Sequence, residues 1–170
     1  MTIRPEEPGD IAAVHEINEK AFGQPAEAHL VDSIRDACPD AVSLVAVRDA
    51  GIVGHIFFTP VTIADDEQEI TGMGLAPMAV LPDYQRQGIG SRLIEAGLEI
   101  LRQRNCPFVI VLGHPEYYPR FGFVPAARHG LMCPWENVPD EAFMVLVLDE
   151  ATMSGVSGVV KYRAEFGEAV

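Results

Sequence analysis

The sequence has few cysteines, no long apolar run and few basic residues. Its three cysteines, Cys38, Cys106 and Cys133, are an odd number without close spacing, which argues against a disulfide framework. The five histidines show no tight ligand spacing with them, so we expect no bound metal. No apolar run approaches the roughly 20 residues of a membrane span, and residues 1–7 contain no apolar signal region. We therefore expect a cytoplasmic protein without a membrane partner.

The charge balance is strongly acidic. Twenty-five acidic residues against 12 basic ones give a formal net charge of −13. Such a chain should repel nucleic acids and anionic membranes. Solubility alone would explain the charge, although it also weakly favours a cationic substrate such as an amine. With 170 residues, 48% of them hydrophobic, the chain is expected to form a single domain over residues 1–170.

Apolar periodicity predicts a mixed α/β chain. The predicted strands cover residues 2–4, 42–48, 52–63, 75–81, 108–112, 123–124, 143–148 and 159–163. The predicted helices cover residues 11–21, with Asp10 as N-cap, 25–37 and 93–101, with a helical turn at 116–121. The runs at 42–63 indicate a hairpin. The strand–helix–strand succession from 75 to 112 indicates a parallel crossover.

Residues 75–104 carry the most informative pattern. An apolar run at 75–81 leads into a turn that ends in Gly88 and Gly90 and opens an amphipathic helix. The first N–H groups of a helix have no partner within it and carry partial positive charge. Glycines let a bulky anion approach the backbone closely. With Arg86 beside it, this turn is suited to a diphosphate.

Two common phosphate-binding loops fail on spacing. A Walker loop requires a lysine after its second glycine, and none follows Gly90. A dinucleotide fingerprint requires a third glycine where this chain has Leu93. The spacing Gln85-x-x-Gly88-x-Gly90 after an apolar strand resembles instead the coenzyme A loop of the GCN5-related N-acetyltransferase (GNAT) family. An ordinary strand–turn–helix with turn glycines is the alternative.

Pro77 lies inside the predicted strand at 75–81. Proline has no N–H for a sheet ladder and is confined to edges and bulges. We therefore expect the ladder to break there and the strand to part from its neighbour. In the family resembled, such a bulge lets the pantetheine arm of the cofactor pair with the strand instead.

A second motif follows the predicted strand at 108–112. Tyr118 stands four places before the pair Gly122-Phe123, as an aromatic residue does in a later GNAT motif. Two motifs in the right order extend the resemblance over most of the chain, closest to a bacterial branch of acetyltransferases. A tyrosine is protonated at neutral pH and can donate a proton to a leaving thiolate. The alternative, a packed aromatic, suits Tyr117 better.

The resemblance implies a fold, a reaction and a set of site residues. The fold is a GNAT fold of the α/β class (an α+β mixed sheet), whose mostly antiparallel central sheet is splayed at a bulge and flanked by helices. The reaction moves an acetyl group from acetyl-CoA to a primary amine by direct attack, with Tyr118 protonating the thiolate and the Val80 N–H stabilising the thioester oxygen. The implied cofactor-binding residues are Met78, Ala79, Val80 and Leu81 along pantetheine and Arg86, Gln87, Gly88, Ile89, Gly90 and Ser91 around the diphosphate.

The sequence does not identify the acceptor substrate or the general base. The acceptor is expected to be a small-molecule or peptide amine, bound by variable loops at 22–34 and 126–139. Trp135 is a candidate lining residue, and packing at the rim of the pocket is the equal alternative. Candidate bases are His55, His114, Glu27 and Glu116, and ordered water could serve instead.

Two further alternatives concern function and assembly. A non-catalytic coenzyme A-binding sensor or interaction module could share the fold, although Tyr118 argues against it. The segment 143–163 could pair with a second copy to give a homodimer.

Overall fold

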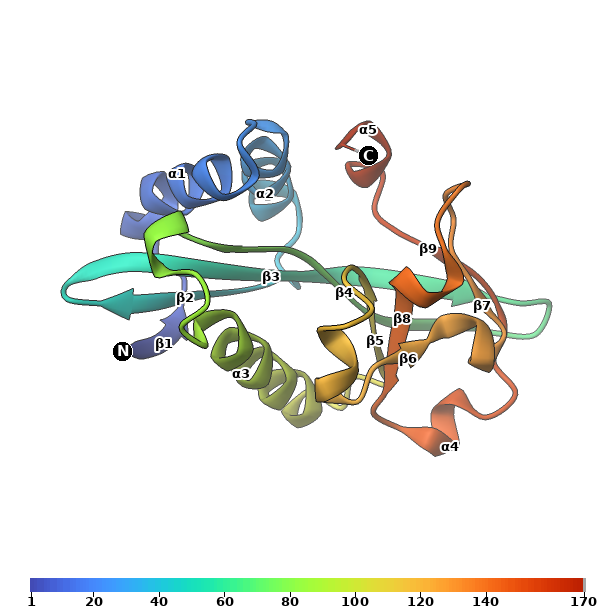
Figure 1. The fold of residues 1–170 in the computed structure, drawn as a ribbon. Helices are drawn as coiled ribbons and strands as arrows, with labels where there is room; N and C mark the ends of the chain where they lie inside the picture. The colour runs from blue at the N-terminus through green and yellow to red at the C-terminus, as the bar shows by residue number, and fades with distance from the viewer. Residues whose placement is uncertain (170) are drawn as a thin grey trace. The chain divides into compact units, whose positions relative to one another are not determined.

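The computed structural model describes residues 1–169 (Figure 1). Its backbone gathers into two compact units. The first unit comprises Met1–Thr59, Ala76–Ile100 and the segment from Ala164 onward, and the second comprises Pro60–Leu75 and Leu101–Arg163. A single domain over residues 1–170 stays a prediction, and its last residue lies outside the described part.

Three elements contribute residues to both units. They are strand β3 (Gly51–Ala64), strand β4 (Glu69–Val80) and helix α3 (Ile89–Gln103). Each unit therefore has a share of the sheet.

In the first unit, strands β1 (Thr2–Pro5) and β2 (Val42–Arg48) form an antiparallel sheet with the start of β3. The β2–β3 hairpin turns at Asp49 and Ala50, whose φ angles are 53° and 65°. Two consecutive left-handed residues are the backbone of a tight hairpin turn that follows the twist of the strands. The predicted hairpin is confirmed.

Helices α1 (Ile11–Phe22) and α2 (Ala26–Ala37) lie side by side in the same unit (Figure 1). Asp10 occupies the N-cap position of α1, but its carboxylate does not cap the helix. It accepts two hydrogen bonds from the Arg4 guanidinium, at 2.7 and 3.1 Å, and one from the Glu7 N–H at 2.7 Å. The bond from Arg4 holds the pKa of Asp10 below its usual value. Asp10 is therefore the N-cap residue, as predicted, but Arg4 and the Glu7 N–H engage its carboxylate, which makes no capping bond to the helix.

Helices α1 and α3 cover opposite faces of β3 within this unit. Asn18 of α1 hydrogen-bonds His55, whereas Leu93 of α3 packs against Gly54. Gly54 and His55 are consecutive strand residues, so they face opposite sides of the sheet. The first unit thus has a helix on each face of its sheet.

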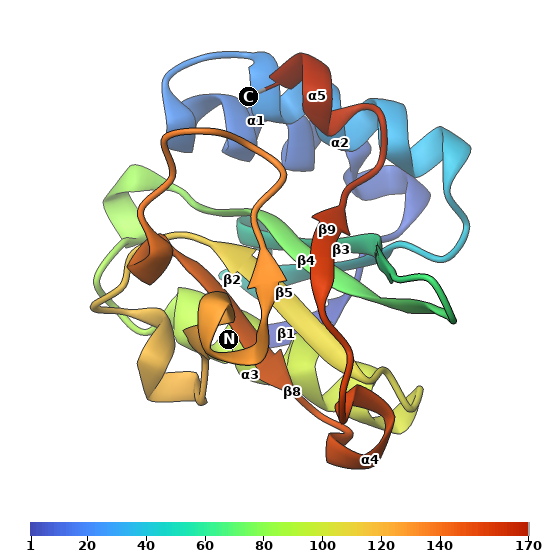
Figure 2. The same cartoon turned by 90° about the vertical axis from the view of Figure 1, so that its right-hand side faces the viewer.

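The second unit holds the later strands. They are β5 (Phe108–Leu112), β6 (Val124–Pro125), β7 (Leu131–Met132), β8 (Phe143–Val147) and β9 (Gly158–Lys161). Strand β8 pairs antiparallel with both β5 and β6, and β9 pairs with β7 and with the end of β3 (Figure 2). The predicted loop at 126–139 thus contains the short strand β7.

Strand β4 pairs parallel with β5, and the register sets Met73 opposite Val109 and Leu75 opposite Val111. The predicted crossover through α3 is therefore confirmed. Ala76 and Pro77 follow, joined by a cis peptide bond. Parting of the strands at Pro77 stays a prediction.

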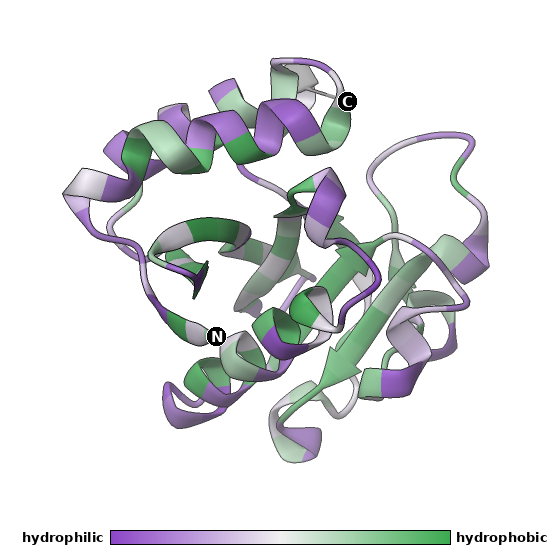
Figure 3. Ribbon diagram, turned by 60° about the vertical axis from the view of Figure 1, so that its left-hand side comes forward, coloured by the Kyte–Doolittle hydropathy of each residue, from purple (hydrophilic) through white to green (hydrophobic). Residues whose placement is uncertain are grey.

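Hydropathy follows this arrangement. The strands are largely hydrophobic, while the helices alternate hydrophobic and hydrophilic residues (Figure 3). The short helices α4 (Glu150–Met153) and α5 (Phe166–Ala169) complete the fold. The fold is mixed α/β, with a mostly antiparallel open sheet flanked by helices, as predicted. Between residues 1 and 169, none of the helices combines the length and the apolar composition that crossing a bilayer requires.

Candidate active site

The loop between β4 and α3 is held in shape by polar side chains of the first unit. Gln85 Nε2 donates to the carbonyl of Val80 at 3.0 Å, and Gln87 Nε2 donates to the carbonyl of Asp83 at 3.3 Å. Arg48 Nη1 donates to Gln87 Oε1 at 2.6 Å, from the end of β2. These bonds fix the turn from within, which lowers the entropy cost of ordering it around a ligand.

The backbone of this loop is left-handed at two residues. Arg86 has a φ angle of 63° and Gly88 a φ angle of 81°. A Cβ built on Gly88 meets no atom within 4 Å, so this glycine borders open space. Helix α3 begins at Ile89, and the first N–H groups of a helix lack acceptors within it. The predicted diphosphate residues Arg86 to Ser91 are therefore together at the helix start, next to open space.

Positive charge collects around this loop although the chain is acidic. Arg86 and Arg92 are exposed, and the Arg48 guanidinium lies over the Tyr84 ring at 5.8 Å from its centroid. Asp83 is the acidic residue of the turn and is also exposed. Arg48 contacts the loop and Arg86 belongs to it, and their guanidinium groups favour an anionic ligand.

The predicted pantetheine residues 78–81 form the end of β4 and the start of the loop. Ala79 is buried, while Met78, Val80 and Leu81 are half-buried. The Leu81 N–H donates to the Val53 carbonyl of β3 at 2.9 Å. Because backbone groups of successive strand residues point to alternate edges, the Val80 N–H points away from β3.

Tyr118 belongs to the second unit, in a 3₁₀ turn (Tyr118–Phe121) after β5. Its side chain is only 7% exposed. The ring lies edge-on to Tyr117 and Phe123, with centroids 5.2 and 5.8 Å away. A Cβ built on Gly113 would approach its Cε2 to 2.5 Å, so the missing side chain makes room for the ring. Burial raises the pKa of Tyr118 to about 12, and the phenol keeps its proton at neutral pH.

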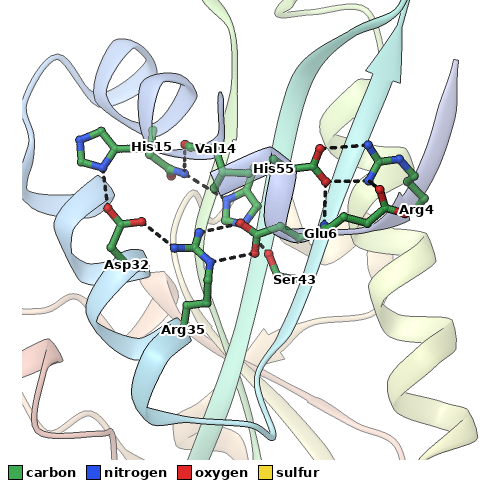
Figure 4. A network of polar contacts seen from close by, with 11 residues as sticks. Arg4, Glu6, Val14, His15, Asp32, Arg35, Ser43 and His55 are labelled. Carbon is green, nitrogen blue, oxygen red and sulfur yellow. Dashed lines mark hydrogen bonds and ion pairs between the residues drawn. The ribbon is translucent and has the colours of Figure 1, made fainter. Parts of the chain in front are cut away.

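His55, one of the candidate bases, is fully buried in the first unit (Figure 4). The Asn18 amide Nδ2 lies 3.1 Å from its Nδ1, and the Ser43 hydroxyl lies 2.8 Å from its Nε2. The Asn18 amide also donates to the Val14 carbonyl. Because an amide nitrogen only donates, Nδ1 is the acceptor and Nε2 carries the proton. Desolvation, helped by the charge of Arg35, lowers the pKa of His55 to about 3.

His55 is thus a neutral core histidine rather than an accessible base. A polar network continues beside it: Arg35 pairs with Glu6 and Asp32 at 2.6 Å each, and Asp32 pairs with His15 at 2.7 Å (Figure 4). Its members come from separate parts of the first 60 residues. No local sequence signal could have revealed it.

Of the other candidate bases, His114 and Glu116 are exposed and Glu27 is half-buried. His114 and Glu116 follow β5 and precede Tyr118, whose N–H lies 3.3 Å from the His114 carbonyl. Glu27, in the first turn of α2, accepts hydrogen bonds from the amide of Gln24, which precedes the helix. Within residues 1–169, no group of three His, Cys, Asp or Glu side chains could hold a metal ion.

The second unit contains a cavity of about 390 Å³ in the segment predicted to bind the acceptor. Trp135 lines this cavity, and its role in binding the acceptor stays a prediction. Other lining residues are Met132, Cys133, Val138, Asp140 and Phe143. Of these, Asp140 and Phe143 lie just outside the predicted loop at 126–139, and Phe143 is the first residue of β8, where a strand was predicted to begin.

Comparison with known proteins identifies relatives along almost the whole chain. The chain is 36% identical over 167 residues to the uncharacterized N-acetyltransferase YhbS of Escherichia coli K12, with 98% of each chain covered. It is 42% identical over 135 residues to the uncharacterized N-acetyltransferase YjhQ of the same strain, which covers 78% of this chain and 74% of YjhQ.

Solved structures of similar proteins also match this chain. The crystal structure of Escherichia coli YhbS in complex with CoA matches with a TM-score of 0.90 at 35% identity, covering 98% of this chain and 91% of that one. A GNAT family acetyltransferase from Brucella melitensis in complex with acetyl-CoA matches with a TM-score of 0.78 at 35% identity, covering 97% of each chain. The family model of the acetyltransferase (GNAT) domain matches residues 2–126. The chain therefore belongs to the GCN5-related N-acetyltransferase (GNAT) family.

Proposed function

We propose that this protein transfers the acetyl group of acetyl-CoA to the amine of a small molecule or peptide. The observation that carries the proposal is the loop between β4 and α3, closed by its own side chains and bordering open space at Gly88. Two similar proteins, at 35% identity, were crystallised with CoA and with acetyl-CoA. The three cysteines are free thiols, which favours a reducing compartment such as the cytoplasm.

The proposed cofactor site uses the loop for the diphosphate and the end of β4 for pantetheine. The N–H groups from Gly88 to Ser91, at the start of α3, bind phosphate oxygens, with the Arg86 guanidinium beside them. Met78 to Leu81 line the pantetheine arm. The Leu81 N–H is already taken by β3, so the arm pairs with backbone groups that point to the other edge.

Val80 has such a group. Its N–H points away from β3, as the bond from Leu81 to Val53 requires. We assign it to the thioester oxygen, where negative charge develops as the amine attacks.

Tyr118 is the proposed acid. The amine nitrogen forms a bond to the thioester carbon, the carbon–sulfur bond breaks, and its electron pair leaves on sulfur. The products are the amide and the thiol of CoA, and one proton from the initial ammonium group leaves to a base or to solvent. The Tyr118 phenol donates to the sulfur as it departs.

The raised pKa of Tyr118 determines how this donation works. The phenol has a pKa of about 12, whereas a thiol has a pKa of roughly 8.5. Complete transfer that leaves a phenolate behind would cost roughly 5 kcal/mol at ~1.4 kcal/mol per pKa unit. The phenol therefore acts as a hydrogen-bond donor, and a proton released by the amine restores it if it transfers its own.

The test measures acetyl-CoA binding and thiol release separately. Calorimetric titration should show one CoA bound per chain, and free thiol should appear when acetyl-CoA is mixed with an accepted amine. Binding without thiol release across amines, amino acids and peptides would point to a non-catalytic module. Failure to bind CoA would refute the proposal.

A homodimer stays a prediction. Strand β8 has partners on both edges, and β9 pairs with β3 and β7. A second copy would therefore have to pack on a surface other than the edges of β8.

A further inference from the structure

The cavity in the second unit has an apolar floor and a single charged lining residue. Leu131 and Phe143, both part of the buried core, form its floor. Its walls include the half-buried Cys133, Trp135 and Val138. Its volume of about 390 Å³ is in the range of small-molecule sites.

Trp135 is held firmly in this wall. Its ring lies 4.7 Å from the ring of Tyr162, centroid to centroid, at an angle of 48°. Tyr162 in turn packs against the core of the second unit. A supported indole offers a rigid surface for an apolar or cationic group.

Asp140 supplies the charge. Among the residues that line the cavity it alone is ionisable with a full charge at neutral pH, and its carboxylate makes no hydrogen bond or ion pair within the described part of the chain. Arg128 and His129 lie nearby along the chain, but neither lines the cavity, and Glu136 adds a further negative charge to the same segment. A cavity that presents both an unpaired carboxylate and an indole selects a cation.

The cavity is joined to Tyr118 through the end of the β5–β8 pair. Phe143 of the cavity floor stands opposite Leu112, and the Gly113 N–H donates to the Ala142 carbonyl at 2.9 Å. Gly113 is the residue against which the Tyr118 ring lies. The cavity and the proposed acid therefore lie at the same end of this strand pair.

We propose that this cavity binds the acceptor, and that the acceptor is an arylalkylamine or an apolar amine of similar size. Its apolar body lies in the cavity against Trp135, and its ammonium group is attracted by Asp140. Calling the bound amine an acceptor rests on the proposed transferase function. The proposal that the cavity binds such an amine does not rest on it.

Trp135 is the only tryptophan of the chain, so its fluorescence reports on the cavity directly. The experiment titrates the full chain, without acetyl-CoA, with 2-phenylethylamine and with its neutral analogue 2-phenylethanol. Excitation where phenyl rings do not absorb isolates the indole signal. We expect a saturable change with both ligands and an affinity for the amine about five- to tenfold higher.

Asp140→Asn and Glu136→Gln form a matched pair of variants. Each removes one negative charge from the same exposed segment, but only Asp140 lines the cavity. Asp140→Asn should abolish the preference for the amine, and Glu136→Gln should retain it. As a second measurement, 2-phenylethylamine should slow alkylation of Cys133, which lines the cavity, and leave Cys38 unaffected.

Each outcome of these experiments supports or overturns the proposal. No saturable change and no protection of Cys133, equal affinity for amine and alcohol, or equal effects of the two variants would overturn the proposal. Acetyl transfer to other amines with an unresponsive Trp135 would remove the cavity assignment and leave the transferase standing. Amine binding without any acetyl transfer would do the reverse.

Discussion

The two parts of the proposed active site are built in different ways. The loop before α3 is exposed, and side-chain hydrogen bonds and left-handed backbone hold it. The Tyr118 side chain is buried, and ring contacts and one missing side chain hold it. The first suits the binding of a charged group, and the second suits the tuning of an acid.

The difference implies that affinity and rate can be separated by mutation. Changes at the loop should weaken CoA binding and leave turnover at saturation largely intact. Changes around Tyr118 should do the opposite, because the contacts described for that residue come from the second unit.

The largest effect is expected for Tyr118→Phe. This change removes the proton donor but keeps the ring and its edge-on packing, so turnover should fall about a thousandfold. The dissociation constant for CoA, measured by calorimetry, should stay within about twofold of the original. Unchanged turnover would remove Tyr118 from the mechanism.

Gly113→Ala tests the same turn without touching the phenol. The added methyl group would sit 2.5 Å from Cε2 of Tyr118, so the ring must shift. We expect turnover to fall up to about a hundredfold, the scale of a misplaced catalytic group. Gly9→Ala is the control, since a Cβ there meets no atom within 4 Å. If Gly113→Ala weakened CoA binding instead, the separation of the two regions would be wrong.

Gly88→Ala tests the loop. A left-handed φ angle of 81° costs a residue with a side chain about 1–2 kcal/mol. The affinity for CoA should therefore fall about tenfold, while turnover at saturating acetyl-CoA is retained. Gly9→Ala again serves as the control. The melting temperatures of the two variants are compared, so that a general loss of stability is told apart from a loss of CoA binding. Normal affinity for CoA with reduced turnover would contradict the assignment of CoA binding to this loop.

Arg48→Ala should have a smaller effect on the same loop. It removes the bond to Gln87 and the contact with Tyr84, and about threefold weaker CoA binding is expected from the loss of one exposed hydrogen bond. Arg104→Ala removes an equal charge from the residue that follows α3 and should leave affinity unchanged. Equal effects of the two variants would show that only net charge matters.

The pH dependence should show no titration of Tyr118 over the usual range. The proton-bearing phenol is the active form, and a raised pKa keeps it protonated until the pH approaches about 12. The ratio of turnover between the original protein and Tyr118→Phe should thus stay constant from neutral pH to about pH 10. A ratio that declines above pH 8 would mean that the phenol is more acidic than its burial allows.

The sequence predicted the loop between β4 and α3, but it did not predict the polar network around Arg35 and Asp32. Gln85, Gly88 and Gly90 are close together in the chain, so their spacing alone carried the pattern. Their geometry follows from local backbone preference and a helix start. Most strands and helices were likewise predictable from apolar periodicity, apart from their ends, the small strand β7 and the one-turn helices α4 and α5.

Contacts between residues that are far apart in the chain produce no local sequence pattern and could not be predicted. Arg4 engages the carboxylate of the N-cap residue Asp10, which makes no capping bond to α1, and Asn18 hydrogen-bonds His55 across 37 positions. The burial that raises the pKa of Tyr118 also depends on residues brought in by the fold. Sequence reasoning therefore identified the groups, and tertiary packing decided their protonation.

The most direct test is a crystal structure of this protein with acetyl-CoA. The diphosphate should lie on the N–H groups from Gly88 to Ser91, the pantetheine arm should run along the end of β4, and the thioester oxygen should accept from the Val80 N–H with Tyr118 near the sulfur. A structure in which the cofactor binds elsewhere, with the loop at Gly88 empty, would contradict the proposed site.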